Sequence, residues 1–162
     1  MKHLLWLFFL ATALNTVATA ETAKKEDQII MVKSDDAEMN AAIEKAQKTL
    51  DTFLETYKKP QQNETDFVLK VKISDDNGSE HFWVTPFRET DTGFVGTISN
   101  TPEIVESVEY GQEYTFKRSD ISDWGYLKDG KRIGSFTVCV TFKHMDKEEV
   151  EMYKRDYGYV CE

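Results

Sequence analysis

The sequence predicts an α+β protein in which one long N-terminal helix packs on a curved antiparallel β-sheet of about five or six strands, with a short C-terminal helix. Three observations lead to this fold class. Apolar residues recur at helical spacing over 39–57, they alternate with polar residues over 67–73, and an Asp-Gly pair at 129–130 lies between two further strand-like segments. One helix followed by a run of strands is typical of this class.

The Asp129-Gly130 pair marks the clearest turn in the chain. Such a pair is preferred in a two-residue type I′ hairpin turn, because both central residues of that turn need φ > 0. The turn fixes the pairing of the flanking strands and places Tyr126 opposite Ile133. Trp124 then lies on the same face of the hairpin as these two side chains.

The first twenty residues have the composition of a secretory signal peptide. Lys2 precedes an apolar run over 4–14, and small residues at 18–20 form a cleavage site. The run is shorter than the roughly 18 apolar residues that a membrane-spanning helix needs, which argues against a retained anchor. We therefore expect the protein to be periplasmic or secreted.

The predicted signal peptide, residues 1–20, precedes a charged segment over 21–28 that we expect to be flexible. The remaining residues, 29–162, have the length of a single domain with one hydrophobic core. A short apolar run at 29–32 would form the first strand of this domain.

The net charge of −9 argues against two classes of partner. Nucleic acids and anionic membrane surfaces attract clusters of Lys and Arg, and the sequence has no such cluster. It also lacks the spacings typical of metal ligands and of phosphate-binding loops. We expect no metal, no cofactor and no membrane insertion after signal cleavage. We expect a monomer whose partner is an unknown envelope protein or small ligand.

Residues 35–59 carry the signals of an amphipathic helix. Candidate N-caps are Ser34, Asp35 and Asp36. Asp35 with Glu38 resembles an N-terminal capping box, and the Lys-Lys-Pro sequence at 58–60 ends the pattern. The helix carries one apolar stripe, formed by Met39, Ile43, Ala46, Leu50, Phe53 and Tyr57. This stripe could be a dimer seam, but a single stripe next to predicted strands is more typical of a helix that covers a sheet.

The alternating segment 67–73 predicts a half-buried strand, and a turn at Asn77-Gly78 connects it to the next strand. If this pair forms a two-residue loop, Ile73 lies opposite Phe82. The apolar faces of the two strands then coincide, which supports this pairing.

Trp83, on the second of these strands, then points to the opposite face of the sheet. The predicted pairing puts it near Lys72, and it shares its face with His81 and Thr85. Pro86 cannot donate a hydrogen bond to a neighbouring strand, so it marks a sheet edge or a β-bulge.

The rest of the chain continues the sheet. Further strands are predicted at 94–98 and 114–116. Residues 136–142 are β-branched and aromatic, which favours a strand, although a helix there is the alternative. Asp146 can cap a final helix that Gly158 ends.

Cys139 and Cys161 are the two cysteines of the chain. In an exported protein we expect them to form a disulfide. On the chain-entropy model this bond stabilises the fold by roughly 3 kcal/mol. A catalytic or metal-binding role is less well supported, because the sequence has no C-x-x-C motif and His144 is the nearest histidine.

Several motifs in order carry a resemblance to a known family: DDAEMNAAIEKAQKTLDTF, EHFWV, GTISNTPE, YGQEYTF and ISDWGYLKDGKRIGSFT. Together they resemble the YegJ-like family of bacterial exported proteins, a domain of unknown function. The resemblance covers nearly all of the chain after the signal peptide and implies no activity. Most motif positions are of types that shape turns: Glu80, Trp83, Gly96, Asn100, Pro102, Gly111, Asp123, Trp124, Asp129, Gly130 and Gly134.

Our first hypothesis for function is a non-catalytic binding or interaction module of the bacterial envelope. Exposed tryptophans are frequent anchors of binding surfaces, so Trp83 and Trp124 are the main candidates. Tyr126 and Asp123 lie close to Trp124 in sequence and complete the candidate binding site.

The alternative hypothesis is an envelope hydrolase. Asp120 and Asp123 form the best carboxylate pair for acid–base chemistry, and His81 is a further candidate. An Asp in the sequence Ser-Asp-Ile-Ser-Asp is more often a turn or cap acceptor, so we favour the non-catalytic hypothesis.

We predict that the mature protein begins at Glu21, because cleavage follows the small residues at 18–20. Intact-mass measurement on protein from the envelope fraction will give the mass of residues 21–162. A mass that retains the first twenty residues would show that this assignment is wrong.

Overall fold

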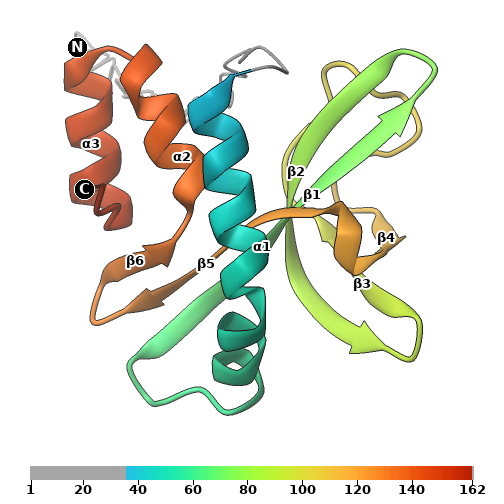
Figure 1. The fold of residues 1–162 in the computed structure, drawn as a ribbon, viewed down its shortest axis with the longest axis horizontal. Helices are drawn as coiled ribbons and strands as arrows, with labels where there is room; N and C mark the ends of the chain where they lie inside the picture. Colours follow the sequence, from blue (N-terminus) through green and yellow to red (C-terminus); the bar gives the residue numbers. More distant parts are fainter. Residues whose placement is uncertain (1–35, 162) are drawn as a thin grey trace, which may run out of the picture.

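The computed structural model describes residues 36–161, in which helix α1 crosses a six-stranded antiparallel sheet (Figure 1). The strand order is β4-β3-β2-β1-β5-β6. This arrangement confirms the predicted α+β class. The elements are α1 (Ala37–Lys58), β1 (Glu64–Asp75), β2 (Gly78–Thr90), β3 (Gly93–Ile98), β4 (Glu113–Phe116), the 3₁₀-helix η1 (Arg118–Asp120), β5 (Ile121–Lys128), β6 (Lys131–Gly134), α2 (Phe136–Thr141), the 3₁₀-helix η2 (Phe142–His144) and α3 (Lys147–Tyr157).

The N-cap of helix α1 is Asp36, one of the three candidate N-caps in the sequence. The Asp36 side chain caps the helix by accepting a hydrogen bond from the Met39 N–H at 2.7 Å. Its end at Lys58 agrees with the prediction. The predicted Asp35 cap, the strand at 29–32 and the segments 1–20 and 21–28 lie outside the described residues.

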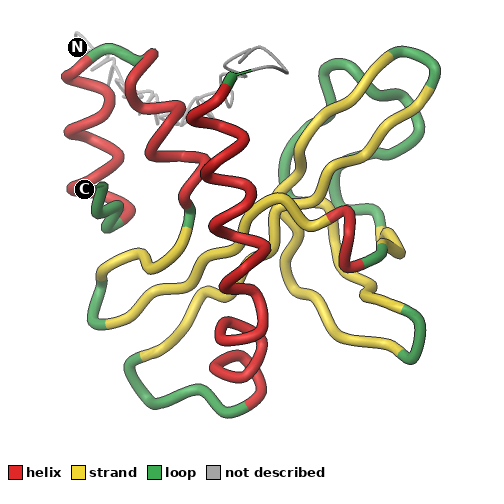
Figure 2. The backbone as a smooth tube through the Cα atoms, viewed as in Figure 1, coloured by secondary structure: helices red, strands yellow, loops and turns green. Residues whose placement is uncertain are grey.

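The apolar stripe of α1 packs against the sheet. Ala46, Leu50 and Phe53 are each 1% exposed and contact a core that includes Leu69 and Phe82. The stripe therefore covers the sheet, as the favoured interpretation predicted, and is not available as a dimer seam. Figure 2 shows the strands spread out around α1.

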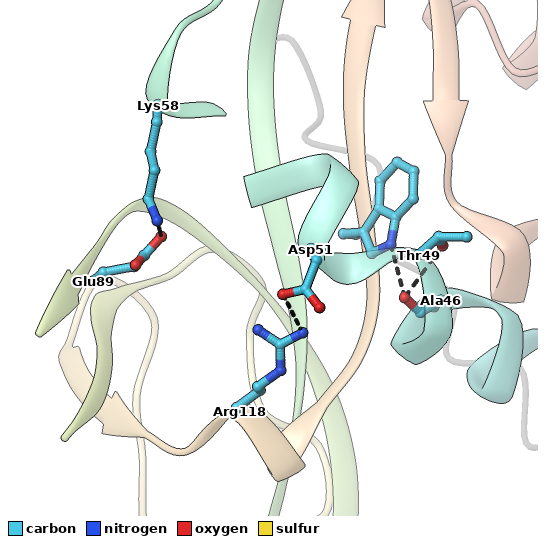
Figure 3. A network of polar contacts seen from close by, with 7 residues as sticks. Ala46, Thr49, Asp51, Lys58, Glu89 and Arg118 are labelled. Carbon is cyan, nitrogen blue, oxygen red and sulfur yellow. Dashed lines mark hydrogen bonds and ion pairs between the residues drawn. The ribbon is translucent and has the colours of Figure 1, made fainter. Parts of the chain in front are cut away.

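Three ion pairs also tie α1 to its surroundings: Glu38 pairs with Lys143 of η2 at 2.7 Å, and the other two are drawn in Figure 3. Asp51 pairs with Arg118 of η1 at 2.8 Å, and Lys58 pairs with Glu89 of β2 at 3.0 Å. Because these side chains are largely exposed, each pair contributes roughly 0 to 1 kcal/mol. The apolar stripe, rather than these charges, holds the helix on the sheet.

The β5–β6 hairpin has the predicted register. Tyr126 pairs with Ile133 and Lys128 with Lys131, and Asp129 and Gly130 both have positive φ. The hairpin was predictable because a type I′ turn determines the pairing locally.

The β1–β2 hairpin differs from the predicted register by two residues. Val71, rather than Ile73, pairs with Phe82. The connecting residues are Asp76 and Asn77, and the Asn77 N–H donates to the Asp75 carboxylate at 2.9 Å. This local hydrogen bond favours a turn in which Asn77 has negative φ, so the expected Asn-Gly turn does not form.

A shift of two residues keeps each side chain on its predicted face. Phe82 and Val84 are fully buried, whereas Trp83 lies on the other face and is partly exposed. The neighbour of Trp83 on β1 changes, however, from Lys72 to Lys70. The predicted irregularity at Pro86 is confirmed by a register shift between Val84 and Phe87.

Two acidic side chains hold the long connection from β3 to β4. The buried Glu80 carboxylate accepts hydrogen bonds from the backbone N–H groups of residues 103–105 at 3.0 to 3.4 Å. Asp75 accepts from the N–H groups of the next two residues, at 2.7 and 3.0 Å. These contacts let Val105 and Val108 join the core.

Residues 136–141 form helix α2, so the favoured strand prediction was wrong and the helical alternative was right. The chain leaves β6 through Ser135, which has a left-handed φ of 54°. The N–H groups of Phe136 and Thr137, at the start of the helix, then donate to the Asp123 carboxylate. This contact with a distant residue overrides the β propensity of the segment. In Figure 1, α2 lies between α1 and α3.

The C-terminal tail lies along the outer edge of β6. After Gly158 ends α3 with a φ of 73°, Tyr159 forms a parallel bridge with Arg132. The Arg132 N–H donates to the Gly158 carbonyl at 2.8 Å. The predicted disulfide between Cys139 and Cys161 is present and joins the end of this tail to α2.

We predict that removal of this disulfide lowers the stability of the protein. The free energy of unfolding of the Cys139→Ser/Cys161→Ser double variant should be roughly 3 kcal/mol lower than that of the wild type, because its unfolded chain is no longer cross-linked. Urea denaturation of the variant and of the wild type measures the difference. Equal urea midpoints would contradict the stabilising effect of the disulfide. Two labelled thiols in unreduced protein from the envelope fraction would show that the disulfide does not form.

Candidate functional site

A row of polar residues extends from Trp83 across the neighbouring strands, on the sheet face that points away from α1. Lys70 on β1 pairs with Trp83 of β2 on one side and with Asp123 of β5 on the other. Because side chains alternate along a strand, Lys70 points away from the core that its neighbours Leu69 and Val71 enter. Three strands thus bring Trp83, Lys70 and Asp123 together.

Asp123 is fully buried and its carboxylate is saturated with donors. One oxygen accepts from the N–H groups of Trp124 and Phe136, at 2.9 and 3.2 Å. The other accepts from the N–H and the hydroxyl of Thr137, at 2.8 and 2.6 Å. Burial raises the pKa of Asp123, and the Thr137 hydrogen bonds and the Lys70 charge oppose this shift. The carboxylate fixes α2 on β5 and has no position left for a ligand.

Lys70 connects this buried carboxylate to the tryptophan. Its Nζ donates to Thr137 Oγ1 at 3.2 Å and lies 5.1 Å from the centre of the Trp83 ring. This distance is within the range of a cation–π interaction. Burial lowers the pKa of the Lys70 ammonium, and the Asp123 charge opposes the change.

His81 and Ser122 form a second contact on the same face. His81 Nδ1 lies 2.7 Å from Ser122 Oγ, and this hydroxyl also lies 3.3 Å from the Lys70 carbonyl oxygen. Burial and the charges of Lys70 and Lys72 lower the pKa of His81 to about 4, so its ring is neutral at pH 7. The Ser122 hydroxyl has one proton, which either the Lys70 carbonyl or an unprotonated Nδ1 can accept. With a pKa of about 4, the imidazole is a weak base for the activation of this serine.

Trp124 and Tyr126 lie in the core. The Trp124 indole stacks on Phe53 at 5.0 Å, and its Nε1–H donates to the Ala46 carbonyl at 2.9 Å. Tyr126 stacks on Phe67 at 5.0 Å. Both side chains are at most 9% exposed, so they stabilise the packing of α1 on the sheet.

Asp120 has a local role next to η1. It accepts a hydrogen bond from the Lys117 N–H at 2.8 Å and one from the Ser119 hydroxyl at 3.1 Å. Within residues 36–161, no hydrogen bond or ion pair joins Asp120, Asp123 and His81 to one another. Each of the three candidate residues for hydrolysis is bonded to other groups of the protein.

Three residues of the site were not predicted: Lys70, Ser122 and Thr137. The predicted register placed Lys72 next to Trp83, and Thr137 was expected in a strand. Ser122 reaches the site because a β-bulge inserts it opposite the step from Lys70 to Val71. The alternation of side chains along β1 does place Lys70 on the same face as Trp83, so this pattern in the sequence could have identified Lys70 as a site residue.

Residues 36–160 match a family described as an uncharacterised protein conserved in bacteria, DUF2314. The chain belongs to this family. It is 37% identical over 133 residues to the uncharacterised protein YegJ of Escherichia coli, a match that covers 82% of this chain and 86% of YegJ. The resemblance noted in the sequence is thereby confirmed.

A second relative is a putative ankyrin repeat protein of Neisseria meningitidis, which is 29% identical over 138 residues. This match covers 80% of the present chain and 54% of the relative, so the chain spans about half of that protein. No solved structure matches the chain. Among the described residues, no group of His, Cys, Asp and Glu is arranged to hold a metal ion, and no helix is long and apolar enough to cross a membrane.

We predict that Asp123→Asn destabilises the protein far more than Asp120→Asn. The amide cannot accept all four hydrogen bonds and leaves the Lys70 charge unbalanced, which should cost roughly 3 to 5 kcal/mol. Loss of the local Asp120 contacts should cost about 1 kcal/mol. Urea midpoints of the two variants measure the difference, and equal costs would contradict the role given to Asp123.

Proposed function

We propose that this protein is a non-catalytic binding module of the bacterial envelope and that Trp83 is its main anchor. The observation that carries this proposal is the contrast between the two tryptophans of the described chain. Trp124 is buried in the core, whereas Trp83 is partly exposed on the face away from α1. The envelope location is supported by the N-terminal signal pattern and by the disulfide.

The backbone at Trp83 is held firmly, which favours a binding role for its side chain. Its N–H donates to the Asn100 side chain at 2.8 Å, and its carbonyl accepts from the Ser99 N–H at 2.8 Å. Strand pairing with β1 adds further support on the other side. An aromatic side chain on a rigid strand loses little conformational entropy when a partner covers it.

The polar groups near Trp83 support binding better than catalysis. Four donors occupy the Asp123 carboxylate, and Asp120 is engaged in its own turn. His81 is neutral and hydrogen-bonded to a buried serine. A general base works best when its pKa is close to the working pH, and the His81 pKa of about 4 makes it a weak base at pH 7.

We predict that Trp83→Ala weakens capture of the native partner with little effect on folding. Loss of an aromatic anchor typically costs 2 kcal/mol or more of affinity, which is roughly 30-fold. The test immobilises each variant, passes native envelope extract over it and measures the bound partner by mass spectrometry. Thermal melting of each variant is measured in parallel.

Two control variants make this test specific. Trp124→Ala removes a buried side chain and should lower the thermal midpoint by several degrees. Thr85→Ala changes a smaller side chain on the same strand and face and should retain capture. If Trp83→Ala captures the partner as well as the wild type does, the binding proposal is wrong. The hydrolase alternative would be favoured if Asp120→Asn or His81→Ala folds normally but fails to restore the phenotype of a strain that lacks the gene.

A further inference from the structure

Lys70 has hydrogen-bonding capacity that the protein does not use. An ammonium group has three N–H donors. Within residues 36–161 Lys70 donates to one acceptor, Thr137 Oγ1, and takes part in no ion pair shorter than 4.0 Å. The nearby Asp123 is already saturated by backbone and hydroxyl donors. Lys70 can therefore donate to a further acceptor that approaches beside Trp83.

Lys72 extends this positive charge along the same strand. It is exposed, it lies two residues after Lys70 on the same face, and the described residues form no ion pair with it. Two lysines at this spacing are about 7 Å apart along a strand. Burial is the main cause of the lowered pKa of His81, and the charges of both lysines lower this pKa further. A local positive strip thus lies on a protein with a net charge of −9.

An extended peptide repeats this spacing, because its side chains at alternating positions also point to one side about 7 Å apart. We infer that the partner presents an extended acidic segment whose alternating carboxylates bind Lys70 and Lys72 while an apolar part of the segment packs on Trp83. Charge complementarity supports a carboxylate at each lysine. The indole supplies the apolar contact at the centre of the site. This inference rests on the proposed binding function and specifies the chemistry of the partner.

The test uses the mature protein and synthetic peptides of ten residues. One peptide carries two Glu at alternating positions and a Phe beside them, and its matched control carries Gln at both positions. Binding is followed by NMR at the Trp83 indole N–H and at the His81 ring. The Glu peptide should shift the Trp83 signal saturably and raise the pKa of His81, because it balances the two lysine charges. The Gln peptide should bind at least about fivefold more weakly.

Variants locate the contact. Lys72→Gln should weaken the Glu peptide about fivefold and leave folding unchanged, since Lys72 is exposed. Lys59→Gln, at the end of α1, should have no effect on binding. Equal binding of the Glu and Gln peptides, or no effect of Lys72→Gln, would overturn the inference.

Sodium acetate is titrated separately. Shifts of the same size at the same carboxylate concentration would show a site for small carboxylates and would also overturn the inference. Failure of the inference can be told apart from failure of the proposed function. If Trp83→Ala loses the native partner while Lys72→Gln keeps it, the binding function stands and the acidic-segment inference is wrong.

Discussion

The buried Asp123 carboxylate is the contact on which much of this structure depends. It joins β5, the strand next to the β6 edge, to the first turn of α2, and the position of α2 in turn sets that of Cys139. The same carboxylate orients Thr137, whose hydroxyl receives the Lys70 hydrogen bond. The environment of Trp83 is thus coupled to the packing of α2 through one residue. A buried carboxylate with all its acceptor positions filled is costly to disturb, which makes this coupling rigid.

Glu80 plays a similar part at the other end of the molecule. Its carboxylate binds consecutive backbone N–H groups and replaces the hydrogen bonds that a regular element would supply to the connection from β3 to β4. Asn100 does the same for the backbone of Trp83. Three of the family motif positions, Glu80, Asn100 and Asp123, are therefore explained by loop and helix-end geometry. Trp83 differs from them, because its side chain is not needed for such a contact.

The parts of the fold that were predicted from sequence are those decided by local chemistry. The Asp129-Gly130 turn fixed its hairpin because the turn type alone determines the pairing. The β1–β2 register was missed by two residues because Asp75 bonds to Asn77 and thereby selects another turn. Residues 136–141 look like a strand, and the group that makes them helical lies on β5. The site was predicted in part, since alternation placed Trp83 on the correct face but could not identify Lys70 or Thr137 as its neighbours.

The sheet has two edge strands, β4 and β6, and the C-terminal tail pairs with β6. An outer strand with unpaired N–H and C=O groups can recruit a strand from another molecule, and such contacts lead to aggregation. On the β6 side the tail occupies the Arg132 N–H, and a covalent bond keeps it there in an oxidising compartment. Residues 158–161 thus cover part of this edge. A purification tag fused directly after residue 161 would be attached next to this covered edge, so a tag on the N-terminal side of α1 is the better choice for work on this domain.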